Sequence, residues 1–538
     1  MLPPGLKTAR EVKRHYDQVY EQHMVSGQYY PFLYPWATVG FAVVLIYLLI
    51  DHRRSPTLRS LRNPLFGFLC AFSAWCILTN KARSSAAAYG VGLVSAWGTL
   101  WTGAIMFFHD CQTDFKRIER ADNIALKKIS GDGHDGHPNG SLSNGSIHKP
   151  TEVSTKKDER LLSKADRVAT QGSWQRTGPL FWQEYPTAPF IERLDWILDA
   201  FCAFRGTGWT FETHGIAPLP PSVTAELSGT PTKNPDPTIM TSRSGIRRFT
   251  NRTALLKDCL TRLTIGFFIL DLIKTLMHHD AYFWGYMDAS APQWFPSTSP
   301  ILLKSYRLLL SLFGIHCALL QIFHLGPIFF TTLPLGVRSE PWMNPPDFYG
   351  NYSAVWNKGL AGWWGSWWHQ TFRYAFEAPA TRLLEALNID KRSQKGKLIS
   401  LFVAFGLSGT LHACGSYTQL GDTRPLMGPF RFFILQAVGI VLQMQVTQTL
   451  RRAGITDKIP QPIQKLGNFL FVNIWMYFTA PLLVDDFAKG GVWLYEPLAI
   501  SPLRLLGFGA PDDNGYDLWY GLIFWRLGKH WWDTGIAF

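Results

Sequence analysis

The chain has 538 residues, a net charge of +13 and only 17% charged residues, against roughly a quarter in soluble domains. Its apolar residues gather in long uncharged runs, which exclude an ordinary soluble protein and indicate a membrane protein. The positive charge lies beside the ends of these runs, as the positive-inside rule predicts, so no nucleic-acid partner is expected. Seven Cys without CxxC spacing predict neither a disulfide framework nor a metal site.

The amino-terminal part predicts a polar segment, 1–30, followed by three transmembrane helices within 31–113. No apolar stretch lies near the start, so no cleavable signal peptide is expected. The run from Pro31 to Ile50 is long enough to cross a hydrocarbon core roughly 30 Å thick, and we interpret it as an uncleaved anchor.

A long polar loop, 114–252, follows these helices, and its Lys and Arg residues predict a cytosolic location. Within it, 131–160 is rich in Gly, Asp, Asn and Ser, which predicts disorder. Residues 189–209 have helical periodicity, which predicts an interfacial helix packed against the membrane part.

Residues 253–538 predict a catalytic membrane domain whose crossings begin with Ala254–Met277 and end with Asp517–Trp532. The whole chain is thus predicted to be an all-α, polytopic membrane protein. About eight or nine transmembrane helices would surround an internal reaction chamber, and no pattern predicts an oligomeric state.

His412 lies inside an apolar run, 398–415, predicted to be one of these helices. An ionisable residue at such depth is a functional-site hypothesis by default. A neutral imidazole can take the proton from a substrate hydroxyl as that oxygen attacks a carbonyl. Ser408, four residues earlier, shares its helix face, and Gly409 and Gly415 allow another helix or a substrate to approach closely. The alternative is a core His that hydrogen-bonds a backbone carbonyl.

A Trp-rich stretch, 341–373, precedes that run and contains six Trp and a single His. As a helix it places Gly365, His369 and Arg373 on one stripe at intervals of four. Aromatic walls beside a His and an Arg suit an apolar molecule next to an anionic group, so Arg373 could hold a phosphate or orient a carbonyl. The alternative is an interfacial Trp belt with a snorkelling Arg. The predicted substrate-binding residues are Arg373, Trp364, Trp368, Gln370 and Ser408.

Two His in one apolar domain suit acyl transfer, in which His412 is the base and His369 donates to the oxyanion or positions a thioester. The chain has no GxSxG elbow and no P-loop, and no metal site is predicted. Two alternatives of other classes are a transporter and a membrane terpene cyclase, for which Asp271 is the best candidate acid.

Three motifs are similar to those of fungal proteins with a wax-synthase domain, within the membrane-bound O-acyltransferase group. They are Arg205-Gly-x-Gly208-Trp209, Trp364-Gly365-x-x-Trp368-His369-Gln370-x-x-Arg373 and Ser408-Gly409-x-x-His412. Their order and spacing agree with that group over roughly residues 190–485.

The resemblance implies a multi-pass O-acyltransferase of the endoplasmic reticulum that uses acyl-CoA as co-substrate, with no bound cofactor and no metal. Its acceptor would be a hydroxyl of an apolar secondary metabolite, such as a terpenoid or meroterpenoid. His412 would be the general base and His369 its partner. Acetyl is the favoured acyl group, and a long-chain wax-ester synthase is the alternative within the same group.

Overall fold

The computed structural model describes residues 2–131, 164, 169–187, 189–231, 235–296, 299–498, 500–513, 515–516 and 523–538. Helices dominate this part of the chain, and short strands form four small sheets. The all-α prediction is therefore confirmed in its coarser form, a mostly helical fold with little sheet. The segment predicted to be disordered, 131–160, lies outside the described residues except for its first residue, so its disorder stays a prediction.

Six helical stretches in the described ranges are long and apolar enough to cross a membrane, with windows of mean hydropathy between 1.4 and 1.9. They are Pro56–Thr79, Ser85–Phe108, Pro300–Thr332, Gln394–Thr418, Leu426–Arg452 and Gln461–Lys489. A shorter apolar helix, Trp36–Leu48, accompanies them. The predicted count of eight or nine is not confirmed.

α11 (Arg252–His278) covers the predicted crossing Ala254–Met277 but is not one of these six helices. Charged residues near its start form ion pairs with other elements. Arg262 Nη1 lies 3.0 Å from Oδ1 of Asp347, and Arg247 Nη2 lies 2.7 Å from Oδ2 of Asp258. These pairs fasten the start of α11 to the Trp-rich stretch.

The last predicted crossing, Asp517–Trp532, is wrong in its described part. Phe524–Arg526 form strand β8, which pairs with β9 (Gly535–Ala537), and β9 also pairs with β2 (Leu33–Tyr34). The backbone of the carboxyl-terminal segment is therefore hydrogen-bonded to the amino-terminal segment in a small sheet. Apolar composition alone does not reveal such long-range pairing.

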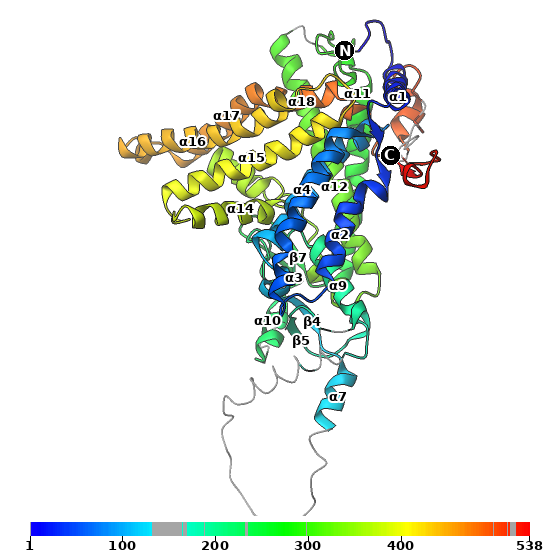
Figure 1. Ribbon diagram of the computed structural model, residues 1–538. Coiled ribbons are helices and arrows are strands. Elements are labelled where there is room, and N and C mark those ends of the chain that lie inside the picture. The colour runs from blue at the N-terminus through cyan, green and yellow to red at the C-terminus, as the bar shows by residue number, and fades with distance from the viewer. Residues whose placement is uncertain are drawn as a thin grey trace, which may run out of the picture.

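The long helices form two groups that differ in direction (Figure 1). α2 (Val39–Leu48), α4 (Arg62–Thr79), α11 and α12 (Pro300–Thr332) run along the molecule, whereas α15 (Gln394–Thr418), α16 (Arg431–Arg452) and α17 (Gln461–Thr479) run across it. α5 (Ser85–Thr102) packs against α15 and so joins the two groups.

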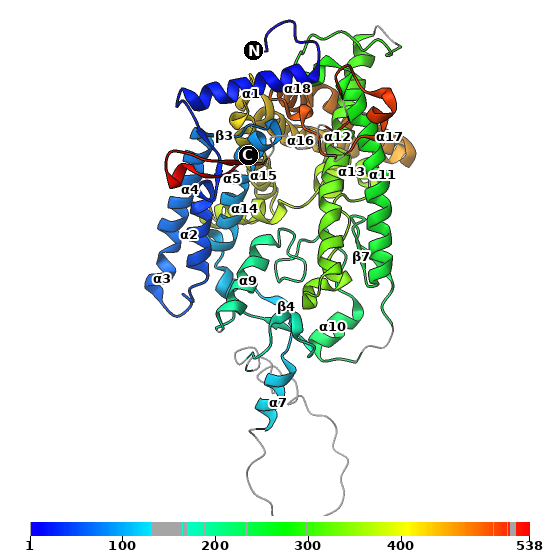
Figure 2. The same ribbon diagram turned by 90° about the vertical axis from the view of Figure 1, so that its right-hand side faces the viewer.

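The two ends of the molecule carry different elements (Figure 2). α1 (Ala9–Val25) lies at one end, and β4 (Arg117–Arg120), β5 (Leu180–Gln183) and α10 (Pro221–Ser228) lie at the other. The shorter elements are β1 (Tyr30–Pro31), α3 (Pro56–Ser60), β3 (Asn80–Lys81), η2 (Gly103–Phe108), α6 (Cys111–Asp114), α7 (Asn123–Gly131), β6 (Ile239–Thr241), β7 (Arg247–Phe249), α13 (Ser353–Gly362), α14 (Arg373–Ala386) and α18 (Pro481–Lys489).

One aromatic core ties α9 (Phe190–Cys202) to the membrane helices. Trp101 of α5, Trp196 of α9 and Trp209 are each at most 2% exposed, and the rings of Trp196 and Trp209 are 4.8 Å apart. Each such side chain buries roughly 150–250 Å². The cluster therefore fixes α9 and the loop that follows it, which reaches the candidate site described next.

Candidate active site

α5 and α15 approach each other closely because glycines lie at their contact. A Cβ atom on Gly92 would lie 1.9 Å from the carbonyl oxygen of Cys414, and one on Gly415 would lie 2.7 Å from the Tyr89 ring. A larger side chain fits at neither position. The close approach predicted from Gly415 is confirmed, and it brings Tyr89 against the turn of α15 that holds His412.

His412 is held between a Tyr and a Phe. Its Nδ1 lies 2.5 Å from Oη of Tyr89, and its ring stacks on Phe433 of α16 at 4.6 Å and 17°. A neutral imidazole has one N–H and one lone pair. When Nδ1–H donates to Tyr89 Oη, the lone pair is on Nε2, which can then accept a proton. The hydrogen-bond partner of Nδ1 is a phenol and not the backbone carbonyl that a simple core His would use.

The helix predicted through Gly365, His369 and Arg373 is interrupted, so the predicted stripe is wrong. α13 ends at Gly362, and a π-helical turn, η7 (Trp363–Trp367), follows it. The backbone is extended after this turn, and α14 begins only at Arg373. His369 therefore lies in a short connection between helices, where tertiary contacts set its direction.

Gln370 stabilises this connection. Its Nε2 donates to the carbonyl oxygens of Trp364 and Trp368 at 2.9 and 2.7 Å, which replaces bonds that the broken helix loses. Arg373 donates from Nη1 to Gln370 Oε1 at 3.2 Å and from Nε to Glu377 Oε1 at 2.9 Å. Both residues are predicted to bind substrate, but Nε2 and Oε1 of Gln370 and Nε and Nη1 of Arg373 are engaged by the protein itself.

His369 packs among aromatic rings. Phe348 stacks on it at 4.8 Å, and Phe372 meets it edge-on at 5.2 Å. Burial, with further contributions from His412 and Arg205, lowers the pKa of His369 from its ordinary 6.5 to about 3. The imidazole is therefore neutral at physiological pH, and its Nδ1 has no hydrogen-bond partner among the described residues.

A continuous row of aromatic rings connects the two His. Successive ring centroids are 4.6 Å apart for His412–Phe433, 5.8 Å for Phe433–Trp364, 5.8 Å for Trp364–Trp368 and 5.5 Å for Trp368–His369. The rings of His369 and His412 therefore border one aromatic region.

The other predicted binding residues lie beside this region. Trp364 and Trp368 are members of the row, and Trp364 Nε1 donates to Gln436 Oε1 at 3.4 Å. Ser408 lies one turn before His412 on α15 and is half-buried.

The loop after α9 supports His369 through a neighbouring segment. Arg205 donates from Nη1 to the carbonyl of Asp347 and from Nη2 to that of Pro345, both at 2.8 Å. These bonds hold the segment that carries Phe348, which stacks on His369. The first of the three motifs therefore reaches the second through Phe348.

Asp271, the acid that a terpene cyclase would need, is engaged elsewhere. It is fully buried, Oδ1 accepts a hydrogen bond from Ser501 Oγ, and Oδ2 accepts one from Leu503 N at 3.0 Å. A carboxylate that accepts two hydrogen bonds from the carboxyl-terminal segment fits a structural role better than proton donation.

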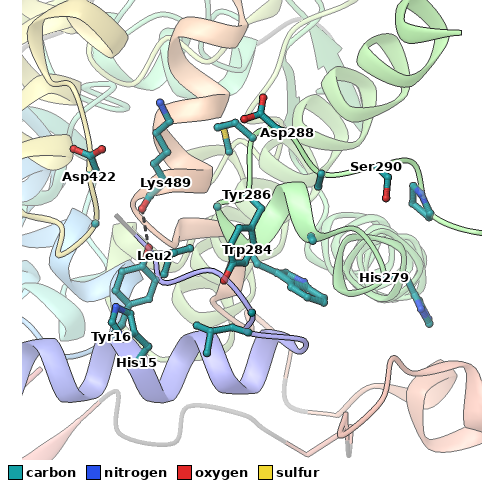
Figure 3. Close-up of a pocket in the computed structure, with 18 of the residues that line it drawn as sticks. Leu2, His15, Tyr16, His279, Trp284, Tyr286, Asp288, Ser290, Asp422 and Lys489 are labelled. Atoms are coloured by element: carbon teal, nitrogen blue, oxygen red, sulfur yellow. Dashed lines mark hydrogen bonds between the residues drawn. The ribbon is translucent and has the colours of Figure 1, made fainter. Parts of the chain in front are cut away.

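A cavity of about 1180 Å³ lies beside α1 (Figure 3). Tyr16, Trp284, Asp422 and Lys489 are among its lining residues, and Tyr16 Oη donates to the Lys489 carbonyl at 2.8 Å. Neither His369 nor His412 lines this cavity. The candidate site therefore rests on the aromatic row and not on this opening.

Sequence reasoning missed Tyr89 and Phe433, which hold His412. Neither belongs to a motif, because each comes from a different apolar helix. The only local signal was Gly415, whose missing side chain makes room for the Tyr89 ring. Tyr349, which lies within the Trp-rich stretch, was not singled out although its ring centroid is 6.4 Å from that of His369.

Residues 345–435 match the membrane bound O-acyl transferase family model. The acetyltransferase eriL of Hericium erinaceus is 28% identical over 172 residues, which cover 31% of this chain and 42% of that protein. The acetyltransferase pyr8 of Aspergillus fumigatus is 28% identical over 252 residues, 45% of this chain and 54% of that protein. The O-Mevalon transferase macI of Penicillium terrestre is 25% identical over 351 residues, 62% of this chain and 68% of that protein.

The chain spans about half the length of the first two of these relatives. No solved structure matches it. The matched segment contains the connection that carries His369, the whole of α15 and the start of α16. The chain is therefore similar to the membrane bound O-acyl transferase family over a segment that holds both His369 and His412.

Proposed function

We propose that this chain is a multi-pass membrane O-acyltransferase that moves an acyl group from acyl-CoA to a hydroxyl of an apolar secondary metabolite. Acetyl is the favoured acyl group, a terpenoid or meroterpenoid is the favoured acceptor, and the endoplasmic reticulum is the expected membrane. One observation carries the proposal: the two His of the family-matched segment border one aromatic region. The names of the relatives, acetyltransferase and O-Mevalon transferase, support the same chemistry.

His412 is the general base in this proposal. Its Nε2 removes the proton from the acceptor hydroxyl while the oxygen forms a bond to the thioester carbonyl carbon. The hydrogen bond between Nδ1 and Tyr89 Oη holds the ring in place, and the mechanism uses the tautomer in which Nδ1–H donates to the phenol and the lone pair is on Nε2.

His369 stabilises the oxyanion of the tetrahedral intermediate. Its Nδ1 has no hydrogen-bond partner in the described part of the protein, so in the Nδ1–H tautomer it can donate to that oxygen. Such a donor is worth about 3 kcal/mol in the transition state. The C–S bond then breaks, and the CoA thiolate takes the proton back from His412, which leaves the ester and CoA.

The aromatic row supports an apolar acceptor. Trp364, Trp368 and Phe433 offer ring faces between the two His, and the ion pair of Arg373 with Glu377 makes Arg373 a weaker candidate for a CoA phosphate. A long-chain wax-ester synthase remains the alternative within the same chemistry. It differs in donor and acceptor length and not in the roles of the His residues.

The test is a microsomal assay with labelled acetyl-CoA or a long-chain acyl-CoA and a panel of hydroxylated terpenoids and long-chain alcohols. We expect a labelled ester from acetyl-CoA and a terpenoid alcohol. His412→Ala should abolish it at an unchanged level of membrane-inserted protein. His214→Ala, at an exposed His outside the site, is the matched control. Near-normal turnover in His412→Ala would overturn the assignment, as would the absence of any ester from the wild type.

A further inference from the structure

A second pair of aromatic side chains with polar atoms, His316 and Tyr349, lies near His369. His316 of α12 stacks on Tyr349 at 4.1 Å and 26°, and the centroid of Tyr349 is 6.4 Å from that of His369. His316 Nδ1 and Tyr349 Oη are buried and, like His369 Nδ1, have no hydrogen-bond partner among the described residues. The Tyr349 side chain as a whole is only 8% exposed.

These unpaired atoms indicate a hydrogen-bond partner from outside the chain. Buried polar side-chain atoms in folded proteins are nearly always hydrogen-bonded, and each exception requires an explanation. His316 also lies inside a helix that can span a membrane, where a polar side chain marks a functional site by default. Phe and Leu would fill the same volumes without an unpaired atom, so stability alone does not explain a Tyr beside a His here.

The surroundings favour a neutral partner. The rings in contact with Tyr349 other than the two His are Phe348, Trp367 and Trp368. A charged group held among such rings would lose its hydration without compensation. Arg205 is the cation whose charge acts on His369, and both of its terminal nitrogens already donate to backbone carbonyls.

The hydrogen-bonding capacity of Tyr349 and His316 also indicates that the atom they bind is an oxygen. Burial raises the pKa of Tyr349, so its phenol keeps the O–H and can donate. A neutral His316 adds one donor or acceptor. A carbonyl oxygen accepts from the phenol, and a hydroxyl can bond to both residues.

We propose that Tyr349 and His316 form an acceptor-binding subsite for a second neutral oxygen, ketone or hydroxyl, on the alcohol that the enzyme acylates. The inference rests on the proposed function and adds the class of substrate: a ring-bearing alcohol with a second oxygen function. The flat aromatic walls suit such a ring system better than the linear pantetheine arm of acyl-CoA.

The distance between the rings guides the choice of spacing between the two oxygens of the probe. The centroid of Tyr349 is 6.4 Å from that of His369, which in the proposed function donates to the oxygen of the thioester carbonyl that the hydroxyl attacks. This distance corresponds to about four or five single bonds of roughly 1.5 Å each. The matched probes are therefore a rigid bicyclic terpenoid hydroxyketone, whose ketone is four or five bonds from the hydroxyl, and the same alcohol with a methylene in place of the ketone.

The experiment compares kcat/KM for the two probes in wild type, Tyr349→Phe and His316→Phe. We expect the wild type to prefer the hydroxyketone by about tenfold, the size of one neutral hydrogen bond. Each variant should lose most of this preference, keep its turnover of the plain alcohol and keep its KM for acetyl-CoA. Both substitutions retain an aromatic ring, and Tyr349→Phe removes only an oxygen without a partner in the described protein.

Tyr352→Phe is the control, because Tyr352 lies in the same stretch and packs on Trp363 and Trp367. It should keep the wild-type preference. Equal kcat/KM for the two probes in the wild type would overturn the subsite. So would an equal loss on both probes in Tyr349→Phe, or a raised KM for acetyl-CoA, which would assign these atoms to the donor. Absence of acyl transfer to every alcohol in the panel would overturn the proposed function instead.

Discussion

The phenol oxygen of Tyr89 lies 2.5 Å from Nδ1 of His412, across the contact between α5 and α15. Phe487 of α18 packs edge-on against the Tyr89 ring at 5.1 Å and limits its movement. In the proposed mechanism Nδ1–H donates to this phenol oxygen, so the lone pair of His412 is on Nε2. Tyr89 is thus a positioning residue that acts through His412.

Replacing Tyr89 with Phe should lower kcat and leave KM for acetyl-CoA nearly unchanged. The variant keeps the ring but loses the oxygen that orients His412, and a misplaced catalytic group can cost about 10²-fold. Steady-state kinetics in detergent or microsomes measures both constants.

Tyr20→Phe is the matched control for this substitution. Tyr20 is a fully buried Tyr of α1 whose hydroxyl has no hydrogen-bond partner within the described residues. Its loss should leave kcat unchanged. Wild-type kcat in Tyr89→Phe, or a fall of equal size in Tyr20→Phe, would remove the positioning role of Tyr89.

Gly92→Ala should damage the contact between α5 and α15. The new Cβ would lie 1.9 Å from the Cys414 carbonyl oxygen, so the helices must separate, and such overpacking typically costs about 1–3 kcal/mol. Gly90→Ala on the same helix meets no atom within 4 Å and is the control. We expect a lower melting temperature and lower kcat only for Gly92→Ala. Equal behaviour of the two variants would contradict this account of the contact.

The positions of the catalytic candidates could be predicted only in part from the sequence. His412 stood out because an ionisable residue inside an apolar run is costly, and that argument needs no tertiary information. Its partner Tyr89 could not be found in this way. Tyr89 reaches His412 only because α5 and α15 meet at Gly92 and Gly415, a contact between segments more than 300 residues apart.

The local geometry of His369 was predicted wrongly for a related reason. Spacing by four indicates a helix face, but the π-helical turn before Trp368 ends the helix. The Gln370 side chain then donates hydrogen bonds to the carbonyl oxygens of Trp364 and Trp368. The same limit applies at Phe524–Arg526, where pairing with β9 outweighs an apolar composition typical of a membrane helix.

His369→Ala and His369→Asn should differ in their effects on kcat. Ala removes the donor to the oxyanion, which typically lowers kcat by about 10²–10³-fold. An Asn amide can place a donor near the position of Nδ1, so His369→Asn should retain more of the activity. Single-turnover kinetics separates this chemical step from substrate binding. Equal kcat in the two variants would argue against a donor role for His369.

The depressed pKa of His369 predicts how protein stability depends on pH. Its pKa is about 3 in the folded state and near 6.5 in the unfolded state. The unfolded state therefore binds more protons between these values, so His369 makes the folded protein progressively less stable as the pH falls from about 6.5 towards 3. Above about pH 6.5 its contribution does not change.

Thermal unfolding of detergent-solubilised protein between pH 4 and 7 measures this dependence. His369→Asn removes the titrating group, so the melting temperature of the variant should fall less steeply over this range than that of the wild type. His214→Asn, at an exposed His, controls for the loss of a His outside the site. Parallel curves for wild type and His369→Asn would show that His369 is not held neutral by burial, and the oxyanion role, which needs a neutral imidazole, would lose its basis.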